Sequence, residues 1–145
     1  MKAPIEVRNA IAIPASAERV WDLLTDVGSW PKWWRACQWV RVESTDTAAR
    51  PTSFRWKAHP VVLSSSVVAS ERPRLFAIVA DSPGLHAERS FTIEPGAAGR
   101  STIVISHETQ VGPLPWFFRL VLGPRLESAN QAMLTDLAQA VRGAS

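Results

Sequence analysis

Three polar side chains in the second half of the chain could do chemistry: Arg89, His107 and Glu108. Each lies in a segment that alternates apolar and polar residues, a pattern typical of a strand with one buried face. A guanidinium on such a face can stabilise the negative charge of a carboxylate or an enolate, and a nearby imidazole can move a proton. Arg89 and His107 are therefore the candidate catalytic residues, and they would suit a cyclisation or a dehydration.

The alternation in residues 86–94 decides where Arg89 points. Arg89 shares a face with Phe91 and Ile93, while the opposite face is polar throughout, so we expect Arg89 to face inward. An inward guanidinium needs a carboxylate, a ligand anion or water, and Glu108 is the first candidate for the carboxylate. A structural alternative stays open, in which these two residues form only an ion pair at the mouth of a cavity.

The alternation in residues 101–111 is less clear. The face that carries Ile103 and Ile105 is the more apolar one, which predicts that His107 points inward and Glu108 outward, unless a bulge turns Glu108 back. An inward His107 could equally be a core histidine with its hydrogen bonds satisfied, without any catalytic role.

Other kinds of site find little support in the sequence. Cys37 is the only cysteine, so it cannot form an intramolecular disulfide, and no thiolate metal site can be built on it. No neighbouring histidine in the sequence would activate Cys37 as a nucleophile. We see no catalytic triad, no phosphate-binding loop and no metal cluster, so we expect neither a metal nor a cofactor.

Composition and charge set broad limits. A chain of 145 residues with 46% apolar and 20% charged residues fits one globular domain, residues 1–145. The net charge is +3, and its arginines are scattered without a basic run or a nucleic-acid-binding motif, so we expect no nucleic-acid partner. The beginning of the chain shows no apolar signal region, and the lone cysteine suits a reducing compartment, so we expect a cytoplasmic protein.

The first part of the chain predicts a strand followed by two helices. Residues 6–13 form the strand; Ser16 then occupies an N-cap position before a helix that starts at Ala17. Gly28 ends this helix, and Pro31 stands near the first position of a second, short one. This second helix carries three of the seven tryptophans.

The rest of the chain changes to a period of two and then ends in a helix. The predicted strands are residues 37–44, 52–59, 61–70, 74–81, 86–94 and 101–111, with proline and glycine turns between most of them. A stripe of apolar residues from Leu122 to Val141 predicts the final helix, which Gly123-Pro124 would kink or start. Strands with segregated helices indicate an α+β fold with a curved antiparallel sheet.

The order of elements and certain residues resemble a known family. The stretch IPASAERVWDLLTDVGSWPKWW resembles the opening of the SRPBCC superfamily of START-like, helix-grip proteins. Downstream, FRWKA, SSVVASERPRLFAIVADSPGLHAERSFTIEP and SHETQVG are similar to its polyketide cyclase/dehydrase branch. That branch more often has a histidine where Arg89 stands and a tryptophan where Phe91 stands, so an inherited acid or base would be missing here. The family's glutamate motif aligns with Glu108.

This resemblance implies a seven-stranded antiparallel sheet, two short helices between strands 1 and 2, and a long C-terminal helix over a hydrophobic cavity. The first tryptophans, Trp21, Trp30 and Trp33, would be core residues, while Trp34 would lie nearer the pocket. The expected ligand-binding residues are Trp34, Phe54, Trp56, Arg89, Phe91, Glu108, Trp116, Leu122, Leu126 and Met133.

Three functions remain open at this point. The first is binding of a small hydrophobic molecule, such as a lipid, polyketide or quinone, because the inner faces are mostly apolar. The second is a polyketide cyclase or dehydratase that uses Arg89 and His107. The third is lipid transfer at a membrane surface through the apolar stretch 114–122, although this stretch is read more simply as the start of the covering helix. Either a monomer or a homodimer is compatible with the sequence.

Overall fold

The computed structural model describes residues 3–58, 60–96 and 100–143. The turns predicted at residues 59–60 and 95–99 lie partly outside these ranges. The elements in chain order are β1 (Ile5–Ile13), α1 (Ala17–Thr25), η1 (Val27–Ser29), α2 (Trp30–Trp33), β2 (Cys37–Thr45), β3 (Pro51–Ala58), β4 (Val61–Glu71), β5 (Leu75–Ser82), β6 (Leu85–Pro95), β7 (Thr102–Val111), α3 (Pro113–Phe117) and α4 (Arg119–Gly143).

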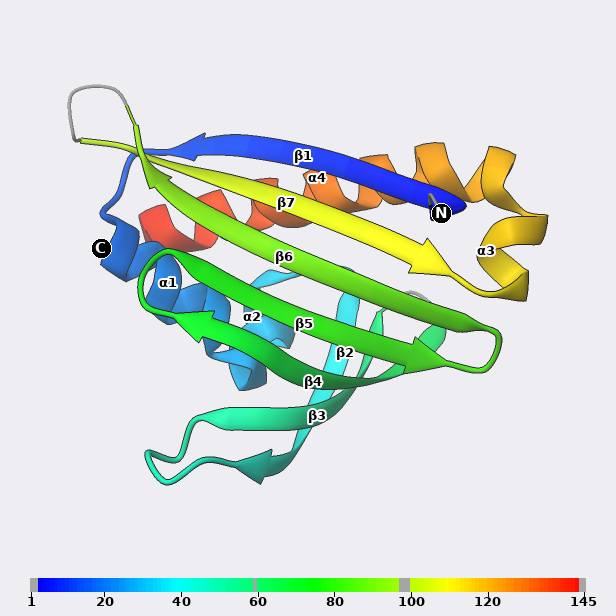
Figure 1. Cartoon of the computed structure of the whole chain (residues 1–145). Helices are drawn as coiled ribbons and strands as arrows, with labels where there is room; N and C mark the ends of the chain where they lie inside the picture. Colours follow the sequence, from blue (N-terminus) through cyan, green and yellow to red (C-terminus); the bar gives the residue numbers. More distant parts are fainter. Residues whose placement is uncertain (1–2, 59, 97–99, 144–145) are drawn as a thin grey trace.

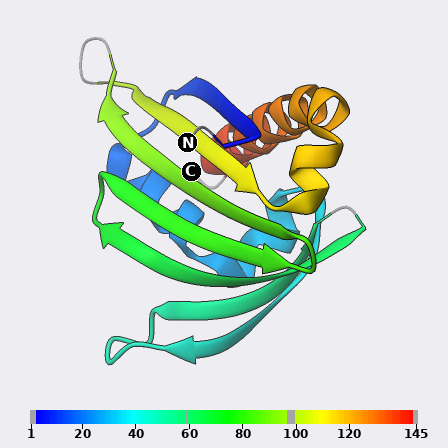
Figure 2. The same cartoon turned by 45° about the vertical axis from the view of Figure 1, so that its right-hand side comes forward.

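The strands form a seven-stranded antiparallel sheet in the order β1-β7-β6-β5-β4-β3-β2. The sheet curves strongly (Figures 1 and 2). Helix α4 packs along β1 at one edge of the sheet, and α2 packs against β2 at the other edge. Helix α1 contacts α4. This arrangement confirms the predicted α+β helix-grip fold, with two short helices between the first two strands.

The two short helices begin and end as their sequences indicate. The Ser16 hydroxyl accepts a hydrogen bond from the Arg19 N–H at 3.2 Å, which caps α1. Helix α1 then buries Val20, Trp21 and Leu24 against the core. Pro31 lies in the first turn of α2, where its missing N–H leaves no hydrogen bond unmade.

The long helix α4 has two unlike halves. Its C-terminal half buries an apolar row against the sheet, including Met133, Leu137 and Val141. The guanidinium of Arg19 donates to the Val141 carbonyl at 2.8 Å, which ties the end of α4 to α1. The half before Asn130 buries no residue. Helix α4 begins at Arg119 and contains Pro124, so Gly123-Pro124 does not start the helix; a kink at this place was the other prediction.

Two glycines fix the place of α3 at the end of the sheet. Gly84 in the β5–β6 turn and Gly112 before α3 have φ angles of 78° and 117°, which favour glycine. A Cβ on Gly112 would lie 2.7 Å from the Gly84 carbonyl oxygen, so only glycine allows the two backbones to approach this closely. The Gly84 carbonyl also accepts a hydrogen bond from the Leu114 N–H.

Candidate functional site

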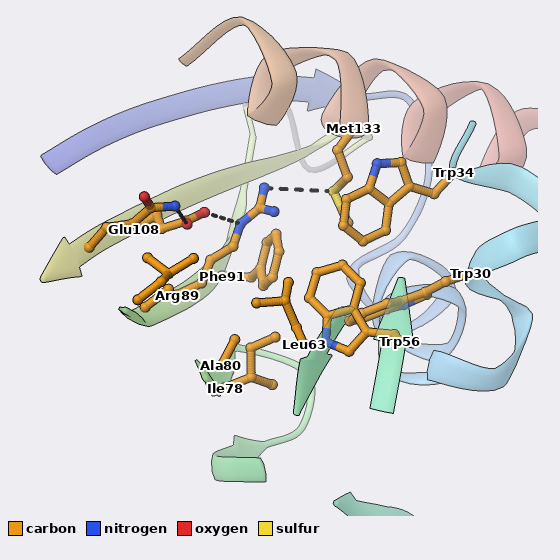
Figure 3. Close-up of a pocket in the computed structure, with 13 residues that line it drawn as sticks. Trp30, Trp34, Trp56, Leu63, Ile78, Ala80, Arg89, Phe91, Glu108 and Met133 are labelled. Atoms are coloured by element: carbon orange, nitrogen blue, oxygen red, sulfur yellow. Dashed lines mark hydrogen bonds and ion pairs between the residues drawn. The ribbon is translucent and has the colours of Figure 1, made fainter. Parts of the chain in front are cut away.

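A pocket lies between the concave face of the sheet and α4. The residues that line it are Trp30, Trp34, Trp56, Leu63, Ile78, Ala80, Leu85, Ala87, Arg89, Phe91, Glu108, Gln110 and Met133. Three tryptophans form one end, and Arg89 and Glu108 form the other, with Leu63 and Phe91 between them (Figure 3). The lining is therefore mostly apolar, with its polar groups gathered at a single end.

The cavity volume is about 60 Å³. A water molecule in the liquid takes up about 30 Å³, so the cavity has room for about two waters or for a guest of a few heavy atoms. Sites for drug-sized ligands are larger, on the order of 300–1,000 Å³. A guest with an aromatic ring is larger than this cavity and would enter only if flexible side chains of the lining, such as Leu63 and Met133, moved aside.

Arg89 projects from β6 into this pocket and is 8% exposed. Its Nε donates to the Ser106 hydroxyl at 2.9 Å, and one Nη lies 3.8 Å from the Met133 sulfur. The guanidinium also stacks 4.5 Å above the Phe91 ring. Desolvation by burial lowers the Arg89 pKa, and the negative charge of Glu108 acts in the opposite direction.

Glu108 balances the charge of Arg89 without a direct hydrogen bond to it. The nearest approach between the two groups is 3.9 Å, from Arg89 Nε to Glu108 Oε1. Each carboxylate oxygen instead accepts from an amide, Oε1 from Asn130 at 2.9 Å and Oε2 from Gln110 at 2.8 Å. The carboxylate therefore accepts its hydrogen bonds from residues of α4 and of its own strand. The Arg89 guanidinium keeps N–H donors that Glu108 does not use.

The aromatic end of the pocket is closely packed. The ring of Trp30 meets those of Trp34, Phe54 and Trp56 edge to face, with centroids 5.4–5.5 Å apart. Two of the indole N–H groups have partners inside the protein: Trp30 donates to the Leu24 carbonyl and Trp56 to the Ser65 hydroxyl. This end of the pocket therefore offers a guest apolar surface.

The structure corrects the predicted facing of β7. Glu108 points into the pocket, whereas His107 lies on the outer face and hydrogen-bonds Glu6 at 2.6 Å. No bulge is involved, since β6 and β7 pair in an unbroken register in which Arg89 stands opposite Glu108. On the inner face of β7, Ser106 hydrogen-bonds Arg89, and Gln110 hydrogen-bonds Glu108. This part of the inner face is therefore polar, and the rule that the more apolar face points inward gives the wrong orientation for β7.

The family of the protein can now be stated. A sequence profile described as "Polyketide cyclase / dehydrase and lipid transport" matches residues 4–142, nearly the whole chain. The chain belongs to this family. Sequence comparison with curated proteins finds no match.

Several solved structures share the fold of this chain. A START superfamily protein from Mycobacterium smegmatis is 20% identical with a TM-score of 0.74, covering 95% of this chain and 94% of its own. The Zhui aromatase/cyclase of a Streptomyces species is 15% identical with a TM-score of 0.82, covering 94% and 93%. A protein from Thermus thermophilus is 19% identical with a TM-score of 0.82, covering 97% and 99%. At these identities the likeness concerns the fold alone.

Within this family fold, several predicted residues do line the pocket: Trp34, Trp56, Arg89, Phe91, Glu108 and Met133. Others lie elsewhere. Phe54 is fully buried beneath Trp30, Leu122 and Leu126 are half-buried outside the pocket lining, and Trp116 is 58% exposed on α3. These last three lie in α3 and in the half of α4 before Asn130, a half that buries no residue.

Sequence reasoning missed other members of the site. Asn130 was hidden within an otherwise apolar helix stripe, although an amide on a buried face is itself a sign of a buried acceptor. Gln110 and Ser106 were placed on the solvent face with Glu108. Aligning the β6–β7 hairpin across its turn would have placed them inward with Arg89.

Cys37 should resist alkylation in the folded protein. Its thiol is 4% exposed, and burial raises its pKa from 9.0 to about 11. At neutral pH this shift leaves about a hundredth of the thiolate that an unshifted group would have. We expect iodoacetamide to modify Cys37 at least about a hundredfold faster in urea than in buffer, as followed by mass spectrometry. Similar alkylation rates in urea and in buffer would show that the Cys37 thiol is accessible in the folded protein, which would contradict its burial.

Proposed function

We propose that the protein binds a small, uncharged, mostly apolar molecule in this pocket, with an oxygen of the guest accepting a hydrogen bond from Arg89. The observation that supports this most is the Arg89 guanidinium, which lines the pocket and makes its recorded hydrogen bonds through Nε to Ser106 and through Nη2 to Met133, so that Nη1 is left for a guest. A charged N–H group at the pocket end can donate to an oxygen of the guest, and hydrogen bonds to charged groups are stronger than those between neutral groups.

The charges around Arg89 favour an uncharged guest over an anion. Glu108 already stands 3.9 Å from Arg89 Nε, so the pair is neutral as a whole. A carboxylate in the pocket would meet the carboxylate of Glu108 at short range in a poorly solvated place, where repulsion between like charges is strong. Carbonyl and hydroxyl oxygens, which ketones, quinones and phenols share, avoid this cost.

The enzyme alternative has less support from this geometry. The Arg89 guanidinium could polarise a carbonyl, as an aromatase or cyclase requires. However, His107, the predicted acid or base, lies on the opposite face of the sheet with Glu6. The predicted pair of Arg89 and His107 therefore does not meet at one reacting atom, and binding is the function that these residues support best.

The proposal is tested by comparing phenol with toluene, which has similar size but no oxygen. We expect the wild type to bind phenol more tightly, and Arg89→Met to weaken phenol binding about tenfold or more while changing toluene binding little, because a hydrogen bond to a charged group is lost. Isothermal titration calorimetry measures both. The outward-facing Arg55→Met on β3 is the matched control and should bind both guests like the wild type.

Two outcomes would overturn this proposal. One is an equal loss for both guests in Arg89→Met, which would mean that Arg89 acts only through packing. The other is tighter binding of benzoate than of phenol to the wild type, which would mean that the site takes anions despite Glu108.

A further inference from the structure

We propose that α3 and the first turn of α4 form a surface that docks onto an anionic lipid membrane. This surface, the α3 corner, consists of Leu114, Trp116, Phe117, Phe118, Leu120 and Val121. It is separate from the pocket lining and goes beyond the proposed binding of a guest.

The large apolar side chains of the α3 corner are exposed to solvent. Leu120 is 84% exposed, Phe117 71% and Trp116 58%, and the other three members are 46–53% exposed. Six large apolar side chains thus reach solvent within eight consecutive residues. The other exposed large apolar residues of the described chain are four valines, which lie on β2, β4 and β7. Scattered single residues are ordinary, whereas a contiguous apolar patch marks an interaction site.

The position of the α3 corner suits contact with a broad surface. Helix α3 and the beginning of α4 form one end of the molecule, beyond the arrowhead of β7 (Figures 1 and 2). The backbone contact between Gly84 and Gly112 anchors this corner to the β5–β6 turn, so its apolar side chains are presented from a fixed base. Trp and Phe on such a projecting element are typical of residues that enter the headgroup region of a bilayer.

The charge of this region is complementary to anionic lipids. Residues 112–126 contain Arg119 and Arg125 and no Asp or Glu. The Arg119 guanidinium lies 4.9 Å from the Trp116 ring and donates to the Trp116 carbonyl at 2.6 Å, which holds the cation beside the largest apolar side chain. A basic group next to an aromatic ring is the pairing that a lipid headgroup layer accommodates.

Arg119 and Arg125 also argue against a second copy of the chain as the partner that covers the α3 corner. A two-fold symmetric interface would place the same apolar patch on both sides and would bury the Arg119 guanidinium of each copy, because this group lies beside the Trp116 ring. Residues 112–126 contain no carboxylate to neutralise them, and the first acidic residue that follows in the chain is Glu127. Anionic headgroups neutralise them directly, which favours a membrane.

Two acidic groups beside the α3 corner define how the protein would lie. Glu6 and Glu88 share a surface groove with Trp116 and Phe117 on the outer face of the sheet, and Glu6 is hydrogen-bonded to His107. These carboxylates would be repelled by an anionic surface. The α3 corner would therefore touch the membrane with the outer face of the sheet turned toward water.

The test is flotation of the full chain with vesicles of phosphatidylcholine alone and of phosphatidylcholine with about one third phosphatidylglycerol. We expect binding to the anionic vesicles, weaker binding to the neutral ones, and a decrease with added salt. The double variant W116S/L120S should reduce binding about tenfold or more, because both side chains would lie among the headgroups. V68S, which removes a 60% exposed valine from β4, should bind like the wild type.

Circular dichroism and thermal unfolding show that each variant is folded before binding is compared, and both double-variant residues are exposed enough to be replaced without loss of the core. The proposal is overturned if the wild type does not float with anionic vesicles or if W116S/L120S floats equally well. It is also overturned if sedimentation shows a dimer that W116S/L120S abolishes while the wild type ignores vesicles. Loss of phenol binding in Arg89→Met with intact flotation would leave this proposal standing, since the two surfaces are separate.

Discussion

Replacing Trp30 with alanine should lower the free energy of unfolding by about 3–5 kcal/mol, the range found when a buried Trp or Phe is truncated. Trp30 is 1% exposed and touches three other aromatic rings edge to face. The substitution also removes the N–H that satisfies the Leu24 carbonyl. Since a domain of this kind is stable by about 5–15 kcal/mol, the loss is a large part of the total.

Urea unfolding followed by circular dichroism measures this effect. Trp116→Ala is the matched control, because the same residue type is removed from a site that is 58% exposed, and we expect a change within about 0.5 kcal/mol. Similar losses for the two variants would show that the aromatic cluster around Trp30 does not hold the α2 end of the fold.

Replacing Glu108 with glutamine should destabilise the protein by about 3 kcal/mol, because it leaves the buried Arg89 cation without its counter-charge. Glutamine keeps the size of the side chain and one acceptor for the Asn130 amide, which donates to Oε1 in the wild type. The substitution also removes the acceptor for the Gln110 amide, so the double variant R89M/E108Q is needed to separate the electrostatic part of the 3.9 Å pairing.

The double variant R89M/E108Q separates charge from packing. If the single Glu108→Gln loss comes from an unpaired cation, removing the cation as well should recover part of the stability, so that the double variant is more stable than E108Q. Thermal unfolding of the four proteins in one double-mutant cycle gives the coupling. Additive losses, with the double variant the least stable, would contradict the electrostatic account.

The fold could be predicted from the sequence because local signals agree with one another. Ser16 caps α1 where a capping residue was expected, Pro31 lies in the first turn of α2, and the period-two segments form strands within one or two residues of their predicted ends. On β3 and β6 the alternation is strong, and Trp56 and Arg89 face inward as predicted. These strands have one face that is plainly more apolar than the other.

The site was harder to predict because its own polar groups blur that alternation. Strand β7 turns Ser106 and Glu108 inward to meet Arg89, and it leaves Ile103 and Ile105 on the outer face. Hydrophobic contrast then favours the wrong face. The pairing of Arg89 with Glu108 across β6 and β7 shows that cross-strand register is the safer guide where a buried charge is present.

The stretch 114–122 shows a second limit of periodicity. Its apolar residues suggested the beginning of a helix over the sheet, yet Phe117 and Leu120 are exposed to solvent, and the half of α4 before Asn130 buries no residue. An apolar stripe indicates a surface that favours contact with another apolar surface. The sequence alone does not say whether that second surface belongs to the same chain. No described helix is long and apolar enough to cross a membrane.

A crystal structure of the complex with phenol tests the central claim most directly. The account predicts phenol between the tryptophan end and the polar end of the pocket, with its oxygen within hydrogen-bond distance of the Arg89 guanidinium and its ring against Leu63 and Phe91. Phenol bound elsewhere, or bound in the pocket with its oxygen turned away from Arg89, would contradict it.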